Sequence, residues 1–340
     1  MKKIAGTPKE LKNVNTSLIM NSIRTRGNAT RSEIVKDTGI SHTTVRGILN
    51  ELIEIDEIIS IGLDESSGGR RAERYKINSN KRYVIVLSVE EAKIVYRVVN
   101  ALGEVLEENA KLINGVEDTK TIIDAIEGLY RVYSNIEGIG ISVPGIVTKD
   151  GFLSGIKMEE WKEIKIKKQL EEKYKIPIIL ENDINSTSIA FYNNYVEENN
   201  CRSMSLVYIS FTSLGVGSGI IVNGNVLKGD DGYAGEIGFI PMQDTFLNVA
   251  IMRDLDDDTY CRIIINTIKT ISAIINPKIV VLGGSNFKYE MKDKIINQYD
   301  KEFNIKTKIL IENKDGDYAL EGIKEKALSL INKEVKLVEI

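Results

Sequence analysis

The sequence predicts a winged helix-turn-helix head, residues 1–78, followed by a larger α/β body. Three short runs with helical spacing of apolar residues precede a hairpin pattern, and the rest of the chain alternates strand-like runs with amphipathic helices. A length of 340 residues also exceeds what one compact domain usually holds. We therefore expect at least two folding units with different tasks.

The head begins with a helix whose apolar residues keep helical spacing over positions 14–23 and which ends at Gly27. The second helix starts at Thr30, and Glu33 three residues later completes the pattern of a capping box. After a short turn, Ser41 can cap a third helix whose apolar residues fall on one stripe. This order is typical of a helix-turn-helix.

A hairpin follows the third helix. Strand-like residues 57–63 and 70–77 flank a tip rich in Ser and Gly, which predicts a two-stranded wing. Glycines allow the backbone to approach a duplex, and guanidinium groups bind phosphate or enter a narrow minor groove. The predicted DNA-binding residues lie at the start of the second helix, in the third helix and in the wing: Arg31, Ser41, His42, Thr43, Thr44, Arg46, Gly69, Arg70 and Arg71.

The charge distribution supports a polyanionic partner for the head alone. Residues 1–80 contain 13 Lys and Arg against 10 Asp and Glu, whereas the whole chain has a formal net charge of −4. The alternative interpretation is a three-helix domain with an ordinary solvated surface and two incidental arginines in a turn.

The composition excludes several classes of protein. His42 is the only histidine, which nearly excludes His-based catalytic relays and zinc sites with two imidazoles. Cys201 and Cys261 are too few for a disulfide framework and favour a reducing compartment. The N-terminus lacks the apolar region of a secretory signal, and no apolar run approaches the length of a membrane span. We expect a cytoplasmic protein without a membrane partner.

The body is expected to alternate strands and helices after a linker at 78–81. Runs rich in β-branched residues predict strands over 83–89, 94–100, 104–113, 136–147, 177–183, 203–211, 218–227 and 278–284. Amphipathic spacing predicts helices over 119–133, 164–175, 185–198, 261–277 and 321–334.

These segments resemble the ROK family (repressor, open reading frame, kinase). TRSEIVKDTGISHTTVRGILNELIE followed by SSGGRRAERYKIN is similar to the winged head of its transcriptional regulators. In the body, GIGISVPGIV, LENDINSTSIAF, GVGSGIIVNGNVLKGDDGYAGEIGF and INPKIVVLGGS occur in the family's order. The resemblance implies an actin-like, ribonuclease-H-like body of two lobes, residues 79–185 and 186–340, with a sugar cleft between them. The last helix, 319–335, is expected to pack back on the first lobe.

The first phosphate loop departs from the family's kinases. There the resemblance implies an Asp, two glycines and a Thr that hold the phosphates of ATP, whereas residues 88–92 of this chain read SVEEA. At about 5 Å and an effective dielectric of about 20, each carboxylate–phosphate contact costs on the order of 3 kcal/mol. We therefore expect no catalytic residue. Gly215–Gly219 and Gly283–Gly284 match the family's other nucleotide motifs, and we interpret them as retained backbone geometry.

The family's zinc site is also missing. Its histidine would follow GEIG directly, where this chain has Phe239, and Cys261 stands alone where the resemblance implies three cysteines. We expect neither a metal nor a cofactor.

The resemblance assigns sugar binding to Asn182, Asp183 and Glu236, because carboxylates and amides hold adjacent hydroxyls in fixed geometry. Lys157 replaces an Asn of the family, and could favour a phosphorylated or acidic sugar or pair with a neighbouring glutamate. In a kinase, Asp183 would take the hydroxyl proton, whereas without a phosphate donor it only orients the sugar. The alternative is that Asn182 and Asp183 merely cap the next helix.

The sequence thus predicts a sugar-responsive, non-catalytic DNA-binding regulator, most simply a repressor. Its expected partners are a double-stranded DNA operator, a sugar or sugar-phosphate effector, and further copies of itself in a homodimer or a dimer of dimers. Two alternatives stay open: an active sugar kinase with a DNA-binding head, and a DNA-binding scaffold that responds to no ligand.

Overall fold

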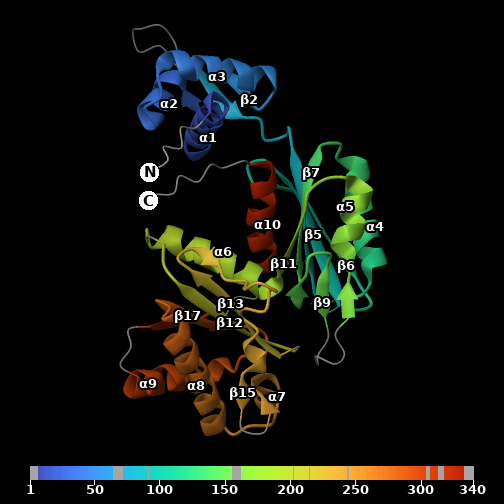
Figure 1. Cartoon of the computed structure of the whole chain (residues 1–340), viewed down its shortest axis with the longest axis vertical. Coiled ribbons are helices and arrows are strands. Elements are labelled where there is room, and N and C mark those ends of the chain that lie inside the picture. The colour runs from blue at the N-terminus through green and yellow to red at the C-terminus, as the bar shows by residue number, and fades with distance from the viewer. Residues whose placement is uncertain are drawn as a thin grey trace.

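The computed structural model describes residues 7–63, 72–90, 92–154, 162–201, 203–213, 215–242, 245–303, 307–312 and 318–332. The head lies at one end of the long axis and the second lobe at the other, with the first lobe and the C-terminal helix between them (Figure 1). The predicted site residues Gly69, Arg70, Arg71 and Lys157 lie outside the described residues. No helix in the described part is long and apolar enough to cross a membrane.

The head contains three helices and a small antiparallel sheet of order β1-β3-β2. Its elements are α1 (Pro8–Arg26), β1 (Ala29–Thr30), α2 (Arg31–Thr38), α3 (His42–Glu54), β2 (Ile58–Leu63) and β3 (Glu73–Ile77). The capping box at Thr30 and the cap at Ser41 are confirmed. Helix α1 starts earlier than its apolar spacing predicts, because Thr7 and Glu10 form a second capping box with proline at the first helical position.

The first lobe is built on a five-stranded sheet of order β11-β7-β4-β5-β6. Its strands are β4 (Tyr83–Val89), β5 (Lys93–Asn100), β6 (Val105–Leu112), β7 (Ile136–Val143) and β11 (Ile178–Asn182). β4, β5 and β6 form an antiparallel meander, whereas β7 runs parallel to β4 and β11. Apolar residues of α4 (Thr119–Val132) and α5 (Ile166–Tyr174) join one core with this sheet. A small sheet of β8 (Ile146–Val147), β9 (Phe152–Ser154) and β10 (Lys162–Ile164) adjoins it.

The second lobe repeats the plan with a sheet of order β14-β13-β12-β17-β18. Its strands are β12 (Leu206–Thr212), β13 (Gly215–Val222), β14 (Asn225–Val226), β17 (Ile279–Gly283) and β18 (Lys308–Ile311). Helices α8 (Asp257–Ile275) and α9 (Lys292–Glu302) share one core with the sheet, and α6 (Asp183–Glu198) shares another. Smaller elements are η2 (Ile237–Phe239), β15 (Pro241–Met242), β16 (Thr245–Phe246), α7 (Leu247–Ile251) and η3 (Tyr289–Met291).

The last described helix, α10 (Tyr318–Ile331), lies between the lobes (Figure 1). It packs on β4 and β7 of the first lobe and on α6 of the second. Two glycines allow this close approach. A Cβ on Gly322 would lie 1.8 Å from the carbonyl oxygen of Ser186, and a Cβ on Gly140 would lie 2.9 Å from the Cβ of Ala327. Helix α10 therefore contacts both lobes through backbone surfaces that tolerate no added methyl group.

Candidate functional site

The candidate sugar site forms where β11 ends and α6 begins. Asn182 is the N-cap of α6: its side-chain oxygen accepts hydrogen bonds from the amides of Ile184 and Asn185 at 2.9 Å each. Its side-chain nitrogen donates to the carbonyl oxygen of Gly145 at 3.0 Å. For Asn182 the structure thus supports the capping interpretation, because both ends of the amide already have protein partners.

Asp183 and Glu236 lie together where the second lobe faces the first. Asp183 is the first residue of α6, Glu236 precedes η2, and both line one cavity of about 110 Å³. Glu236 is positioned by Gly235, whose φ of 101° suits glycine and whose added Cβ would lie 2.2 Å from the carbonyl oxygen of Ser218. Asn182 lines the same cavity, but its amide already has protein partners, so these two carboxylates are the better placed of the predicted ligands to bind a sugar.

Asn248 lines the same cavity and was not anticipated from the sequence. Its side-chain oxygen accepts a hydrogen bond of 2.6 Å from the amide of Val216. Cβ atoms on Gly215 and Gly238 would lie 2.5 Å and 2.3 Å from that oxygen. No motif marks Asn248, since only the folding of α7 against β13 brings it to the cleft.

The two carboxyl groups have raised pKa values. Burial raises the pKa of Asp183 to about 6, although the Ile184 amide hydrogen bond opposes this shift. Burial raises the pKa of Glu236 to about 7, and the negative charge of Asp183 adds to the effect. Near neutral pH the pair therefore offers both a protonated donor and ionised acceptors, which is the combination that adjacent hydroxyl groups use.

Replacing Glu236 by glutamine is expected to raise the melting temperature at pH 8 and to change it little at pH 4. The carboxyl has an ordinary pKa of 4.5 and a folded value of about 7, so the native state binds more protons between these pH values. Wild-type stability therefore falls as the pH rises through this window, and glutamine removes the loss. Thermal unfolding at pH 4 and pH 8 measures this difference in melting temperature, and Glu117→Gln at an exposed position is the control. An equal change in melting temperature at the two pH values would contradict the raised pKa of Glu236.

Glu181, which the motif places beside these residues, does not line this cavity. Its carboxylate is 1% exposed and lies 2.8 Å from the ammonium nitrogen of Lys228 and 2.5 Å from that of Lys326. Burial alone would raise the pKa of Glu181, but the charges of Lys326 and Lys228 outweigh burial and lower it. Because Lys228 belongs to the second lobe and Lys326 to α10, Glu181 links three parts of the body.

A second, larger cavity of about 440 Å³ opens beside the first. Ser88 and Glu90 line it at the end of β4, and the Glu90 carboxylate lies 3.4 Å from the ammonium nitrogen of Lys93. This ion pair partly neutralises Glu90, so its repulsion of a phosphate is weaker than for an isolated carboxylate. The neighbouring Glu91 lies outside the described residues.

The glycine-rich segment Gly215–Gly219 is part of strand β13, not a loop. Its glycines are required by packing. An added Cβ on Gly217 would lie 2.4 Å from the Ile184 side chain, and one on Gly219 would lie 2.7 Å from the Ile184 carbonyl oxygen. The close approach of α6 to β13 therefore accounts for them without a bound phosphate.

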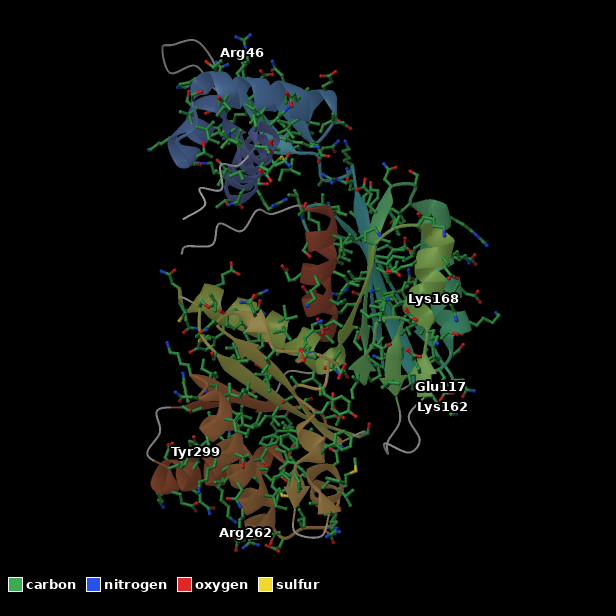
Figure 2. All side chains as sticks on the ribbon, viewed as in Figure 1. Arg46, Glu117, Lys162, Lys168, Arg262 and Tyr299 are labelled. Carbon is green, nitrogen blue, oxygen red and sulfur yellow. The ribbon has the colours of Figure 1, made fainter. Side chains whose placement is uncertain are left out.

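The candidate DNA-facing surface is the start of α3. His42, Thr43 and Arg46 are exposed, and Arg46 projects from the side of the head that faces away from the body (Figure 2). Ser41 and Thr44 are exposed as well, but the Ser41 hydroxyl caps the helix by accepting from the Thr44 amide at 3.3 Å. Arg31, at the start of α2, is also exposed. The structure thus leaves a polar helix end open to a large partner.

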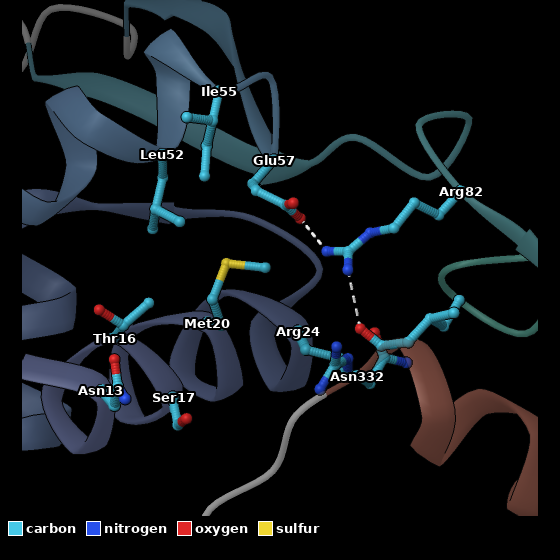
Figure 3. Close-up of a pocket in the computed structure, with 11 residues that line it drawn as sticks. Asn13, Thr16, Ser17, Met20, Arg24, Leu52, Ile55, Glu57, Arg82 and Asn332 are labelled. Carbon is cyan, nitrogen blue, oxygen red and sulfur yellow. Dashed lines mark hydrogen bonds and ion pairs between the residues drawn. The ribbon is translucent and has the colours of Figure 1, made fainter. Parts of the chain in front are cut away.

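The head is joined to the body through Arg82, shown in Figure 3. Its guanidinium pairs with Glu57 of the head and donates a 2.9 Å hydrogen bond to the carbonyl oxygen of Ile331 at the end of α10. Glu137 of β7 lies 3.7 Å away. The side chains of Arg82 and Glu57 are only 19% and 16% exposed, so the pair is largely shielded from solvent. Beside it, a cavity of about 460 Å³ separates α1 from the body.

Residues 87–261 match the family described as the ROK family. The chain belongs to the ROK family. It is 27% identical over 237 residues to the xylose repressor of Bacillus subtilis (strain 168). The aligned region covers 67% of this chain and 60% of that protein. The match thus spans less than two thirds of that relative's length.

Two solved ROK structures show the fold. The crystal structure of a ROK family transcriptional regulator, a homolog of the E. coli MLC protein, superposes with a TM-score of 0.70 at 17% identity over 94% of this chain and 97% of that chain. The ROK hexokinase from Thermus thermophilus gives a TM-score of 0.55 at 18% identity and covers 74% of this chain and 99% of its own. The body therefore has the actin-like sugar-kinase fold of ROK proteins.

The part of the chain that the structure describes contains no cluster of three or more His, Cys, Asp or Glu side chains that could bind a metal ion. Phe239, at the position of the family's zinc histidine, instead packs edge-on against Phe246 with ring centroids 6.1 Å apart.

Proposed function

We propose that this ROK protein is a sugar-responsive, non-catalytic transcriptional regulator whose head is a winged helix-turn-helix. The observation that carries the proposal is the combination of an exposed α3 start with a body whose cleft holds Asp183 and Glu236. The head would place α3 in the major groove and the wing, with Gly69, Arg70 and Arg71, on the adjacent backbone or minor groove. A xylose repressor among its relatives supports this function.

The proposed effector is a sugar bound between Asp183 and Glu236. Lys157, which lies outside the described residues, would contact an acidic substituent of that sugar if the effector carries one. Asn182 would hold the Asp183 backbone in place through its cap, and so act on the sugar indirectly. Two heads in a homodimer would read two half-sites of one operator.

A continuous path joins the proposed effector site to the head. Asp183 opens α6, whose Ser186 touches Gly322 of α10, and the end of α10 holds Arg82 against Glu57. Packed helices move as units, so a shift of α6 towards a bound sugar is passed to α10 and then to the head. A regulator of this type requires that the sugar bind more tightly to one head position than to the other.

The wing is tested by the double variant Arg70→Ala, Arg71→Ala. If both guanidinium groups contact phosphate, operator affinity falls, and the slope of log affinity against log salt decreases by about 2. Titration of labelled operator duplex at several salt concentrations measures both. Lys168→Ala, on the flank of the body away from the head, is the control that removes a positive charge outside the proposed interface (Figure 2). Unchanged affinity and slope would remove the wing from the interface.

A second candidate function is that of a sugar kinase with a DNA-binding head, because a ROK hexokinase has the same fold as the body. A coupled enzyme assay over a panel of sugars tests this alternative: ATP-dependent phosphorylation that is abolished by Asp183→Asn would establish an enzyme.

The second alternative, a DNA-binding scaffold that responds to no ligand, is tested by thermal-shift measurements. A bound sugar at 100 times its Kd adds about 2.7 kcal/mol to the free energy of unfolding. The absence of any shift across the panel would favour the scaffold.

A further inference from the structure

We propose that the two cavities of the cleft together bind a disaccharide or another glycoside, with one sugar ring at Asp183 and Glu236 and the attached unit in the larger cavity. This inference rests on the proposed function and names the class of its effector. Its first support is continuity: Pro144, Asp183, Ile184 and Thr212 line both cavities. The two cavities therefore adjoin at Asp183, which places the larger one next to a sugar held there.

The lining of the larger cavity suits a neutral, hydroxyl-rich ligand. Side chains with hydroxyl groups are the largest group, and they come from both lobes and α10, among them Ser88, Ser210, Ser285 and Tyr318. The hydroxyls of Thr187, Thr212 and Tyr289 already donate to backbone carbonyl oxygens and keep their acceptor capacity. Hydroxyls both donate and accept, so they match a sugar whose groups do the same. Tyrosine adds an apolar ring face beside a polar group, which suits the alternating faces of a pyranose.

The charge of the same cavity disfavours a polyanion. Its charged lining residues in the described part are Glu90, Asp183 and Lys93, and Lys93 is already paired with Glu90. A nucleoside triphosphate would thus meet the carboxylate of Asp183 and a Lys93 ammonium already paired with Glu90, at the place where kinases need positive charge. A second sugar unit brings no charge and meets no such repulsion. The larger cavity therefore has the size and polarity to hold part of the effector.

The test compares D-glucose and D-xylose with cellobiose, xylobiose and isomaltose by isothermal titration of the full chain. At least one disaccharide is expected to bind tenfold or more tightly than its monosaccharide. Ser285→Trp places a large side chain at an exposed position on the cavity wall, and is expected to abolish this tenfold advantage while leaving monosaccharide affinity unchanged. Asn286→Trp changes the neighbouring exposed residue, which does not line the cavity, and should alter neither affinity.

The outcomes separate this inference from the function on which it rests. Binding of a monosaccharide as tight as that of every disaccharide overturns the inference and leaves the sugar-responsive regulator standing. A disaccharide advantage that survives Ser285→Trp also overturns it, as does competition between AMP-PNP and the disaccharide. If no sugar of either size binds, both proposals fail.

Discussion

Replacing Gly322 by alanine is expected to lower the free energy of unfolding of the body by about 2 kcal/mol. The new Cβ would lie 1.8 Å from the Ser186 carbonyl oxygen, and a backbone atom inside α6 cannot rotate away as a side chain can. Overpacking of this kind costs about 1–3 kcal/mol, occasionally more. Alanine also favours a helix over glycine by about 1 kcal/mol, and this gain opposes part of the loss.

Gly128→Ala is the matched control for this variant. Gly128 lies inside α4, and an added Cβ would meet nothing within 4 Å. The same substitution there gains helix propensity without a clash, so it should leave stability unchanged or raise it by up to about 1 kcal/mol. Urea unfolding of the three proteins gives the comparison. A Gly322→Ala protein as stable as the control would show that α10 and α6 are not in the contact described.

Arg82→Ala is expected to uncouple the head from the effector. In the wild type, a sugar should change operator affinity by a factor within the range of about 5 to 150 that is common for coupled sites. Alanine removes both the contact with Glu57 and the hydrogen bond to the Ile331 carbonyl oxygen, so this factor should fall towards 1. Sugar affinity measured without DNA should stay unchanged, because Arg82 lines neither cleft cavity.

The measurement is operator binding with and without the sugar that gives the largest thermal shift. Arg131→Ala removes an exposed guanidinium from α4 and should retain the full response. A full response in Arg82→Ala would mean that the head senses the body by another route. A wild type without any response would instead count against the sugar-responsive regulator itself.

Most elements of the fold could be predicted, because apolar periodicity and caps are local signals. The Thr30 capping box and the Ser41 cap are examples in which the residues that start a helix are also those that the structure uses. The short elements α7, η2, β15 and β16 were not anticipated, because two to five residues carry too little periodicity to be recognised.

The candidate site was predictable only in part. Asp183 and Glu236 lie in recognisable motifs, and the structure brings both to one cavity. Asn182 lies in the same motif, yet its amide caps α6, and a motif cannot distinguish these two uses of one side chain. Asn248 and Arg82 depend on contacts between distant segments, which no local pattern encodes.

The position of α10 has a consequence for biosynthesis. Val84, Val86 and Val99 belong to strands made early, but they are buried with Ile323, Ala327 and Ile331 near the end of the chain. A nascent polypeptide released from the ribosome before this helix emerges has an uncovered apolar sheet face, which favours aggregation or degradation. A message cut short before α10 would therefore yield a partial body prone to aggregation or degradation and not a stable shortened protein.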